Sequence, residues 1–302
     1  EAYLGLIEKA RKINLPVVGH QPVSMRAEEI SNLGQKSVEH FGNAWGGLMI
    51  DCSSDEAALR KEVQALIPLA ESGVNPGELF QKQGKDWQKR LADSYDAKKA
   101  ERLARIFKRN RTWLDPTIYG FAYVWTFLSP AEVARDPRLK YLPRDSQKMA
   151  QDAAQGSNDA KPNAEVQEIQ RRFYQNQLHL VRTMKRNGVG FLAGTDTAPF
   201  PPIFPGFSLH DELEKLVEAG LSPAEALQAA TINSAKFFDK SNEQGSISVG
   251  RRADLVMLSA NPLVDIRNTR RIEAVMLGGK NLDRKVLDKM LAGVETFQKG
   301  KS

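Results

Sequence analysis

The chain has 302 residues, a net charge of +6 and a hydrophobic fraction of 41%, the composition of a globular protein with a sizeable core. No run of about 18 apolar residues is present, so we expect no membrane-spanning helix. The densest basic stretch, residues 82–111, interleaves acidic and apolar side chains in the pattern of a solvated amphipathic helix. We therefore expect no nucleic acid and no membrane as partners. The single cysteine, Cys52, excludes a disulfide within these residues.

Helical patterns alternate with short apolar runs through the first two thirds of the chain. Helices are predicted at 1–14, 24–33, 54–72, 78–82, 86–110 and 164–187, and strands at 15–19, 37–39, 112–118 and 188–193. This alternation favours βαβ units and a parallel sheet. Between the third and fourth strands, residues 129–163 are rich in Pro and polar side chains. Such an insert is either a lid over the strand ends or a surface excursion without function.

The remaining third of the chain changes from helical to β patterning. Residues 198–207 are rich in Pro and Phe and predict a loop, and helices follow at 210–219 and after Ser222, which opens a capping box with Glu225. Strands are predicted at 246–249, 254–258 and 272–277, with a closing helix at about 284–298. We expect one domain over residues 1–240, with an insert at about 120–165, and a small β-rich domain over 241–302.

Metal-ligating side chains follow three of the predicted strands. His20 follows the first strand, His40 the second and Asp196 the fourth. Reacting groups of α/β barrels sit at the carboxyl ends of the strands, and imidazole and carboxylate suit zinc and related divalent ions. Together the three residues predict a metal site. Taken singly, each has a structural alternative, as a hydrogen-bonded histidine or a turn residue.

The joined pattern from Ala193 to Leu258 resembles the metal-dependent amidohydrolase superfamily, above all its imidazolonepropionase-like group. Gly-Thr-Asp-Thr at 194–197 resembles the eighth-strand motif of that family, and Val-Gly-His20 and Val-Glu-His40 resemble its fifth- and sixth-strand metal histidines. Residues 245–256 resemble the return into its small β-sandwich. The resemblance implies an α/β fold, the (β/α)8 TIM barrel of the amidohydrolase type, present only as its second half (strands 5–8) with part of the sandwich.

The resemblance also implies a chemistry. His20 and His40 would bind one divalent metal, with zinc the expected ion and one or two ions in the complete protein. Asp196 would ligate the other metal and act as general acid/base while metal-bound hydroxide attacks an amide or lactam carbonyl. The reaction would hydrolyse a C–N bond other than an ordinary peptide bond, in a small-molecule amide or dipeptide. A prolidase-like dipeptidase and a non-catalytic scaffold or inactive fragment are the alternatives.

The chain departs from the family pattern at its beginning. The first-strand His-x-His pair and the bridging fourth-strand Lys or Glu are absent from the sequence, which starts at Glu1 within a predicted helix. We therefore expect a piece of a longer protein that binds metal weakly by itself. The sequence leaves open the substrate, a cytoplasmic or exported location, and assembly into a homo-oligomer.

Three further side chains are candidates for substrate contact. Tyr119 follows the third predicted strand, Phe204 lies in the Pro- and Phe-rich loop, and His210 opens the next helix. The two aromatic rings either form an apolar wall for a substrate or pack the insert against the barrel. His210 either touches substrate or forms a local hydrogen bond. We interpret His179, in the middle of a predicted helix, as structural.

Overall fold

The structure is a computed structural model that describes residues 1–43, 45–74, 84–156, 163–197 and 202–300. It forms two compact units, and each is described by itself. Unit 1 comprises residues 1–116 and 162–192, and unit 2 comprises residues 117–161 and 193–302. The predicted helix at 78–82, residues 198–201 of the predicted loop and residues 157–162 of the insert lie outside the described residues. The predicted domain boundary at residue 240 stays a prediction.

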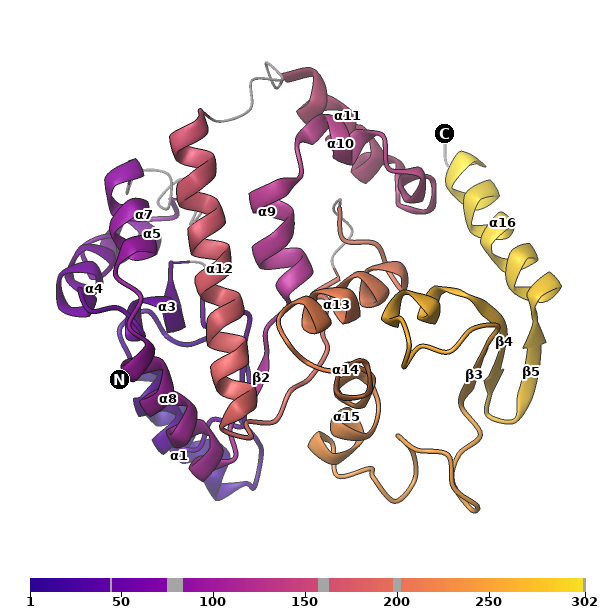
Figure 1. Ribbon diagram of the computed structural model, residues 1–302, viewed down its shortest axis with the longest axis horizontal. Helices are drawn as coiled ribbons and strands as arrows, with labels where there is room; N and C mark the ends of the chain where they lie inside the picture. The colour runs from indigo at the N-terminus through magenta and orange to yellow at the C-terminus, as the bar shows by residue number, and fades with distance from the viewer. Residues whose placement is uncertain (44, 75–83, 157–162, 198–201, 301–302) are drawn as a thin grey trace. The chain divides into compact units, whose positions relative to one another are not determined.

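Unit 1 is mainly helical (Figure 1), and its longest helix, α12, packs against α7 and α8. Its helices are α1 (Ala2–Lys12), α2 (Ala27–Asn32), α3 (Gly47–Asp51), α4 (Glu56–Gln64), α5 (Ile67–Glu71), α7 (Gly84–Asp93), α8 (Ala97–Asn110) and α12 (Ala164–Arg186). The helix predicted at 54–72 is interrupted between α4 and α5. Pro68 explains the break, because it lacks a backbone N–H and its ring clashes with the carbonyl four residues earlier.

The single helix predicted at 86–110 is also wrong, since it divides into α7 and α8 at residues 94–96. The Asp96 carboxylate caps α8 by accepting the backbone N–H of Lys98 at 2.8 Å and of Lys99 at 3.2 Å. The Asp96 backbone N–H donates to the carbonyl of the buried Cys52 at 2.6 Å. A hydrogen bond to a distant part of the chain thus fixes where α8 begins.

Two short parallel strands form the sheet of unit 1. β1 (Ser37–Glu39) pairs with β2 (Trp113–Asp115), in a register that sets Glu39 beside Asp115. The strand prediction at 37–39 is confirmed. β2 is shorter than the predicted 112–118, because Pro116 has no N–H to donate to a ladder.

The strands predicted at 15–19 and 188–193 do not form in the described structure. Residues 17–19 make two backbone hydrogen bonds alongside β1, from Lys36 to Val17 (2.7 Å) and from Glu39 to Gly19 (3.3 Å). Pro16, which lacks an N–H, and Gly19, with φ of 120°, explain why no regular strand develops there. Residues 190–192 flank β2 through a single parallel bridge, Leu114 to Phe191. The described residues therefore contain two parallel strands and not the four of a half barrel.

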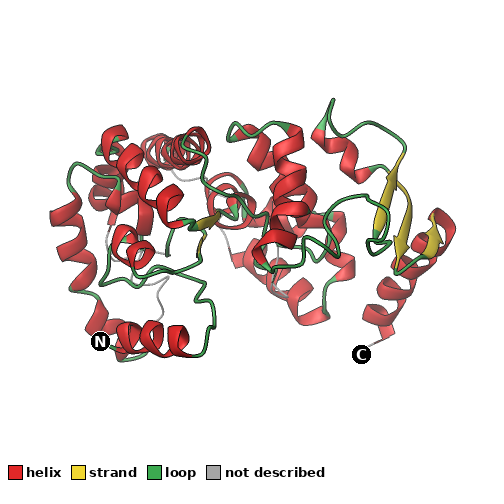
Figure 2. Ribbon diagram, turned by 90° about the horizontal axis from the view of Figure 1, so that it is seen from below, coloured by secondary structure: helices red, strands yellow, loops and turns green. Residues whose placement is uncertain are grey.

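Unit 2 combines helices with a small antiparallel sheet (Figure 2). Its helices are η1 (Tyr119–Tyr123), α9 (Val124–Phe127), α10 (Pro130–Ala134), η2 (Pro137–Tyr141), α11 (Arg144–Gly156), α13 (Phe207–Glu218), α14 (Pro223–Ala230), α15 (Ile232–Phe237), η3 (Ile266–Arg270) and α16 (Arg284–Gly300). The described part of the insert is thus largely helical. Within the described ranges, no helix has the length and apolar character needed to cross a membrane.

The sheet of unit 2 has the order β3 (Leu255–Leu258), β4 (Ile272–Leu277) and β5 (Lys280–Asp283). The strand predicted at 246–249 is absent from the described structure, where Val249 is fully exposed and finds no strand to pair with. β5 is a strand that the sequence did not predict. The turn Gly278–Gly279, with φ of 56° and 83°, forms the hairpin that pairs β5 with β4.

The predicted capping box at the start of α14 is confirmed. The Ser222 hydroxyl accepts the backbone N–H of Glu225 at 3.3 Å, and the Ser222 N–H donates to the Glu225 carboxylate at 2.6 Å. Pro223 occupies the first turn, where a backbone N–H has no helical acceptor.

Candidate active site

Unit 1 brings the two predicted histidines together. His20 follows residues 17–19 and His40 follows β1, and their ring centroids are 4.9 Å apart with the planes inclined at 58°. His40 is buried, with 6% of its surface exposed, whereas His20 is exposed. One ring of the pair is therefore buried, and the other is exposed to solvent.

Backbone hydrogen bonds tie together the two loops that carry these rings. The N–H of Gln21, directly after His20, donates to the Gly42 carbonyl at 2.7 Å. The N–H of His40 donates to the Asp115 carbonyl at 2.7 Å. His40 has a φ of 55°, in the left-handed region that a non-glycine residue adopts only where its surroundings hold it. The separation of the rings is thus set by the chain on both sides of them.

The buried member of the pair is neutral at pH 7. Burial, together with the charge of His20, lowers the pKa of His40 to about 4. Neutral imidazole is the form that coordinates a metal ion. The environment of His40 therefore keeps this ring ready for coordination.

Two glycines allow the chain after His40 to fold back on itself. Gly42 has a φ of 99°, and a Cβ at this position would lie 2.5 Å from Gln21 Oε1 and 3.0 Å from the Leu48 nitrogen. A Cβ on Gly47 would overlap the Phe41 carbonyl oxygen. A larger residue at Gly42 would therefore crowd the Gln21 side chain of the His20 loop, and one at Gly47 would crowd the chain directly after His40.

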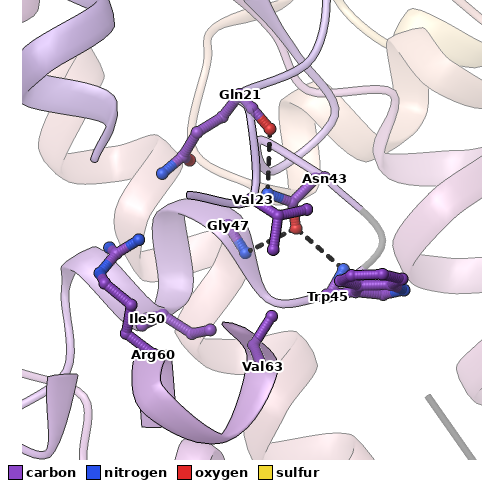
Figure 3. Close-up of a pocket in the computed structure, with 8 residues that line it drawn as sticks. All are labelled: Gln21, Val23, Asn43, Trp45, Gly47, Ile50, Arg60 and Val63. Atoms are coloured by element: carbon purple, nitrogen blue, oxygen red, sulfur yellow. Dashed lines mark hydrogen bonds between the residues drawn. The ribbon is translucent and has the colours of Figure 1, made fainter. Parts of the chain in front are cut away.

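A small pocket lies beside the same loops (Figure 3). The Asn43 side chain is part of its lining, donating from Nδ2 to the Gln21 carbonyl at 3.1 Å and accepting at Oδ1 from the backbone N–H of Trp45 (2.9 Å) and Gly47 (3.2 Å). The lining residues are Gln21, Val23, Asn43, Trp45, Gly47, Ile50, Arg60 and Val63. None of them was predicted from the sequence. The one available signal was position, because Gln21 and Asn43 follow the two histidines closely.

Asp196 belongs to unit 2, whereas both histidines belong to unit 1. It lies in an irregular segment, is exposed and has a φ of 48°. The flanking hydroxyls of Thr195 and Thr197 are 2.6 Å apart. No cluster of three or more His, Cys, Asp or Glu side chains suited to a metal ion occurs among the residues placed by the structure. The catalytic and metal roles of Asp196 stay predictions.

The three predicted substrate contacts all have partners within unit 2. Phe204 is 1% exposed in the apolar cluster of the insert. The Tyr119 hydroxyl accepts a hydrogen bond from Arg138 at 3.4 Å, and Nδ1 of His210 lies 3.0 Å from the Thr269 hydroxyl. These contacts give each side chain a packing or bonding role. Their contact with substrate stays a prediction.

A buried glutamate in unit 2 is a further residue that sequence reasoning missed. Glu212, on α13, is 0% exposed, and its carboxylate accepts the backbone N–H of Ile118 at 3.0 Å and of Tyr119 at 2.7 Å. These bonds hold the start of η1, directly after Thr117, whose φ is 46°. A glutamate in an amphipathic helix carries no sequence signal of such a role.

Residues 141–282 match the family model described as amidohydrolase family, a range that includes Asp196 and begins after both histidines. These residues belong to the amidohydrolase family. Among relatives, an adenine deaminase from Oleidesulfovibrio alaskensis is 38% identical over 74 residues, covering 24% of this chain and 12% of the relative. An imidazolonepropionase from a Geobacillus species is 51% identical over 41 residues, covering 14% of this chain and 10% of the relative. The resemblance to the amidohydrolase superfamily and its imidazolonepropionase-like group is confirmed.

Solved structures show which fold the chain resembles. A bottromycin amidohydrolase aligns with a TM-score of 0.63 at 18% identity, over 98% of this chain and 56% of that chain. A Xaa-Pro dipeptidase with methionine bound in its active site aligns with a TM-score of 0.52 at 16% identity, over 93% of this chain and 48% of that chain. The predicted α/β fold class is confirmed, and the chain spans about half the length of the structures it matches.

Proposed function

We propose that this protein is a metal-dependent amidohydrolase that hydrolyses a C–N bond other than an ordinary peptide bond, in a cyclic amide or a related small amide. The observation that carries the proposal is the His20–His40 pair, with ring centroids 4.9 Å apart. Two imidazoles at this separation, the buried one neutral, fit the donor set of zinc and related divalent ions. Because backbone hydrogen bonds hold the two loops with their rings side by side, the arrangement supports a joint role for the two histidines.

We also propose that unit 1 supplies strands 5–8 of an amidohydrolase (β/α)8 barrel. Four segments bonded side by side in series support this assignment, because residues 17–19 bond alongside β1, β1 pairs with β2, and β2 bridges to Phe191. They follow one another in the order of the chain, as neighbouring barrel strands do. His20 and His40 would then stand at carboxyl ends of strands, where barrel enzymes carry their reacting groups.

In this assignment the two histidines bind the metal ion and Asp196 transfers the proton. The chemistry that a bound divalent ion would supply is polarisation of the substrate carbonyl and a lower pKa of water. His20 and His40 would hold the ion through ring nitrogens. Asp196 accepts the proton of the attacking water and delivers it to the leaving nitrogen. That delivery matters because an amine leaves slowly from carbon unless it is protonated first.

Metal analysis and an amide-hydrolysis panel test the proposal. We expect the purified protein to bind Zn²⁺ weakly in titration calorimetry, and His40→Asn to lose most of that binding. Asp196→Asn should lower hydrolysis by roughly 10²-fold or more, since general acid–base groups contribute about 10²–10⁴-fold. His179→Gln is the matched control, because His179 lies on α12 against Tyr95 and should leave both measurements unchanged.

The panel compares cyclic amides with Xaa-Pro dipeptides, which separates the leading proposal from a prolidase-like dipeptidase. Cleavage of the dipeptides alone would favour the dipeptidase. A protein that binds no zinc at millimolar concentration, and whose Asp196→Asn variant matches the wild type on every amide, would be a non-catalytic scaffold and would refute the proposal.

A further inference from the structure

A buried carboxylate is hydrogen-bonded to the loop that carries His20. Asp51, the last residue of α3, has 6% of its side chain exposed. Its Oδ2 accepts from Gln21 Nε2 at 2.8 Å and from the backbone N–H of Ala27 at 2.7 Å. Its Oδ1 bonds the guanidinium of Arg60. One carboxylate therefore joins the His20 loop, the start of α2 and α4.

Gln21 connects Asp51 to the loop that carries the neighbouring His20. Its carboxamide nitrogen donates to the Met25 carbonyl at 2.8 Å as well as to Asp51. Its backbone carbonyl accepts from Asn43 Nδ2 at 3.1 Å (Figure 3), and its backbone N–H donates to Gly42 at 2.7 Å. Gln21 is 2% exposed. The residue after His20 is thus bonded to the chain after His40 on one side and to Asp51 on the other.

The charge of Asp51 is balanced by a chain of ion pairs. Arg60 also lies 3.6 Å from Glu56, and Glu56 pairs with Lys99 at 2.8 Å. A buried ion pair contributes little net stability compared with apolar residues of the same shape. Burial also raises the pKa of Asp51 to about 6, in spite of the Arg60 guanidinium. Stability alone therefore gives little reason for a carboxylate at this position.

We propose that Gln21 and Asp51 are positioning residues for the histidine pair. Asp51, fixed by Arg60, orients the Gln21 carboxamide, and Gln21 fixes the loop that sets the His20 ring against the His40 ring. This inference rests on the proposed function for its purpose, since the pair is the proposed holder of a divalent ion. Its geometry is a property of unit 1 alone and can be measured without metal.

The test compares Gln21→Leu and Asp51→Asn with the control Lys99→Met, all confirmed as folded by thermal unfolding. Lys99→Met breaks the far end of the same charge cluster and leaves Gln21 untouched. The first readout is the ring-to-ring NOE between His20 and His40 in metal-free protein labelled in histidine. We expect the wild type and Lys99→Met to show it, and both other variants to lose most of it.

The second readout is Zn²⁺ affinity by titration calorimetry. Changes beyond the direct ligands typically cost about 10–100-fold in metal affinity, so we expect about a tenfold loss in Gln21→Leu and none in Lys99→Met. An unchanged NOE in folded Gln21→Leu and Asp51→Asn would overturn the inference. A wild type that binds no Zn²⁺ would refute the proposed function, and the NOE would still decide the positioning role.

Discussion

The histidines of unit 1 and the aspartate of unit 2 differ in how the protein holds them. His40 is buried, and backbone bonds on both sides fix the loops of His20 and His40. Asp196 is exposed, in an irregular segment with a φ of 48°. The first part of the predicted site is built into the packing of one unit. The second depends on a surface segment, so substitutions in unit 1 and unit 2 should separate metal retention from proton transfer.

The largest expected effect comes from a substitution in unit 1, in the chain that follows His40. Gly47→Ala should lower the free energy of unfolding by about 4 kcal/mol, because the new Cβ overlaps the Phe41 carbonyl oxygen at a φ of 26°. Urea denaturation measures the change. Gly5→Ala, in α1 with no atom within 4 Å of the new Cβ, is the control and should stabilise by about 0.5–1 kcal/mol. A Gly47→Ala variant as stable as wild type would contradict the close approach.

An intermediate effect is expected in unit 2 from its buried glutamate. Glu212→Leu leaves the N–H groups of Ile118 and Tyr119 without their acceptor, which should cost about 3 kcal/mol of unfolding free energy. Glu214→Gln, at a partly exposed ion pair with Arg270, should cost less than about 1 kcal/mol. The NOE between His20 and His40 should be unchanged in both variants. Loss of that NOE in Glu212→Leu would show that the two units are not independent in this respect.

The smallest expected effect is a pH dependence of the unfolding free energy that arises from Asp51 in unit 1. The pKa of Asp51 is raised from 3.8 to about 6 in the folded protein, so the folded state binds more protons than the unfolded state between these values. The stability from protonated Asp51 is full below pH 3.8 and is lost as the pH rises through 6.

Relative to Asp51→Asn, the wild type should therefore lose about 2 kcal/mol of unfolding free energy between pH 4 and pH 7. Urea denaturation at a series of pH values measures this difference. Parallel pH profiles for the two proteins would show that Asp51 does not titrate in this range.

Local patterns predicted the elements whose own residues carry a clear signal. β4 has the predicted bounds, Ile272–Leu277, and α14 begins at the predicted capping box. β5 was missed because Lys-Asn-Leu-Asp at 280–283 lacks β patterning and pairs only through the glycine turn before it. The division of the helix predicted at 86–110 was missed because it depends on the bond from Asp96 to Cys52, far away in the sequence.

The candidate site shows the same limit. His20 and His40 were predicted as neighbours because each follows an apolar run, and the structure brings them together. Asp51 and Glu212 were not predicted, because their roles consist of bonds to residues 30 and more than 90 positions away. A carboxylate in a helix has the same sequence signature whether it faces solvent or an interior N–H.

The buried thiol next to Asp51 makes opening of unit 1 measurable. Cys52 is the single cysteine of the chain, is 0% exposed, and burial raises the pKa of its thiol well above the usual range. A thiol reagent can modify it only when the region around α3 opens, since the reactive thiolate requires solvent. The rate of alkylation therefore reports local opening of unit 1 near the histidine pair, read at one native atom without any substitution in the chain.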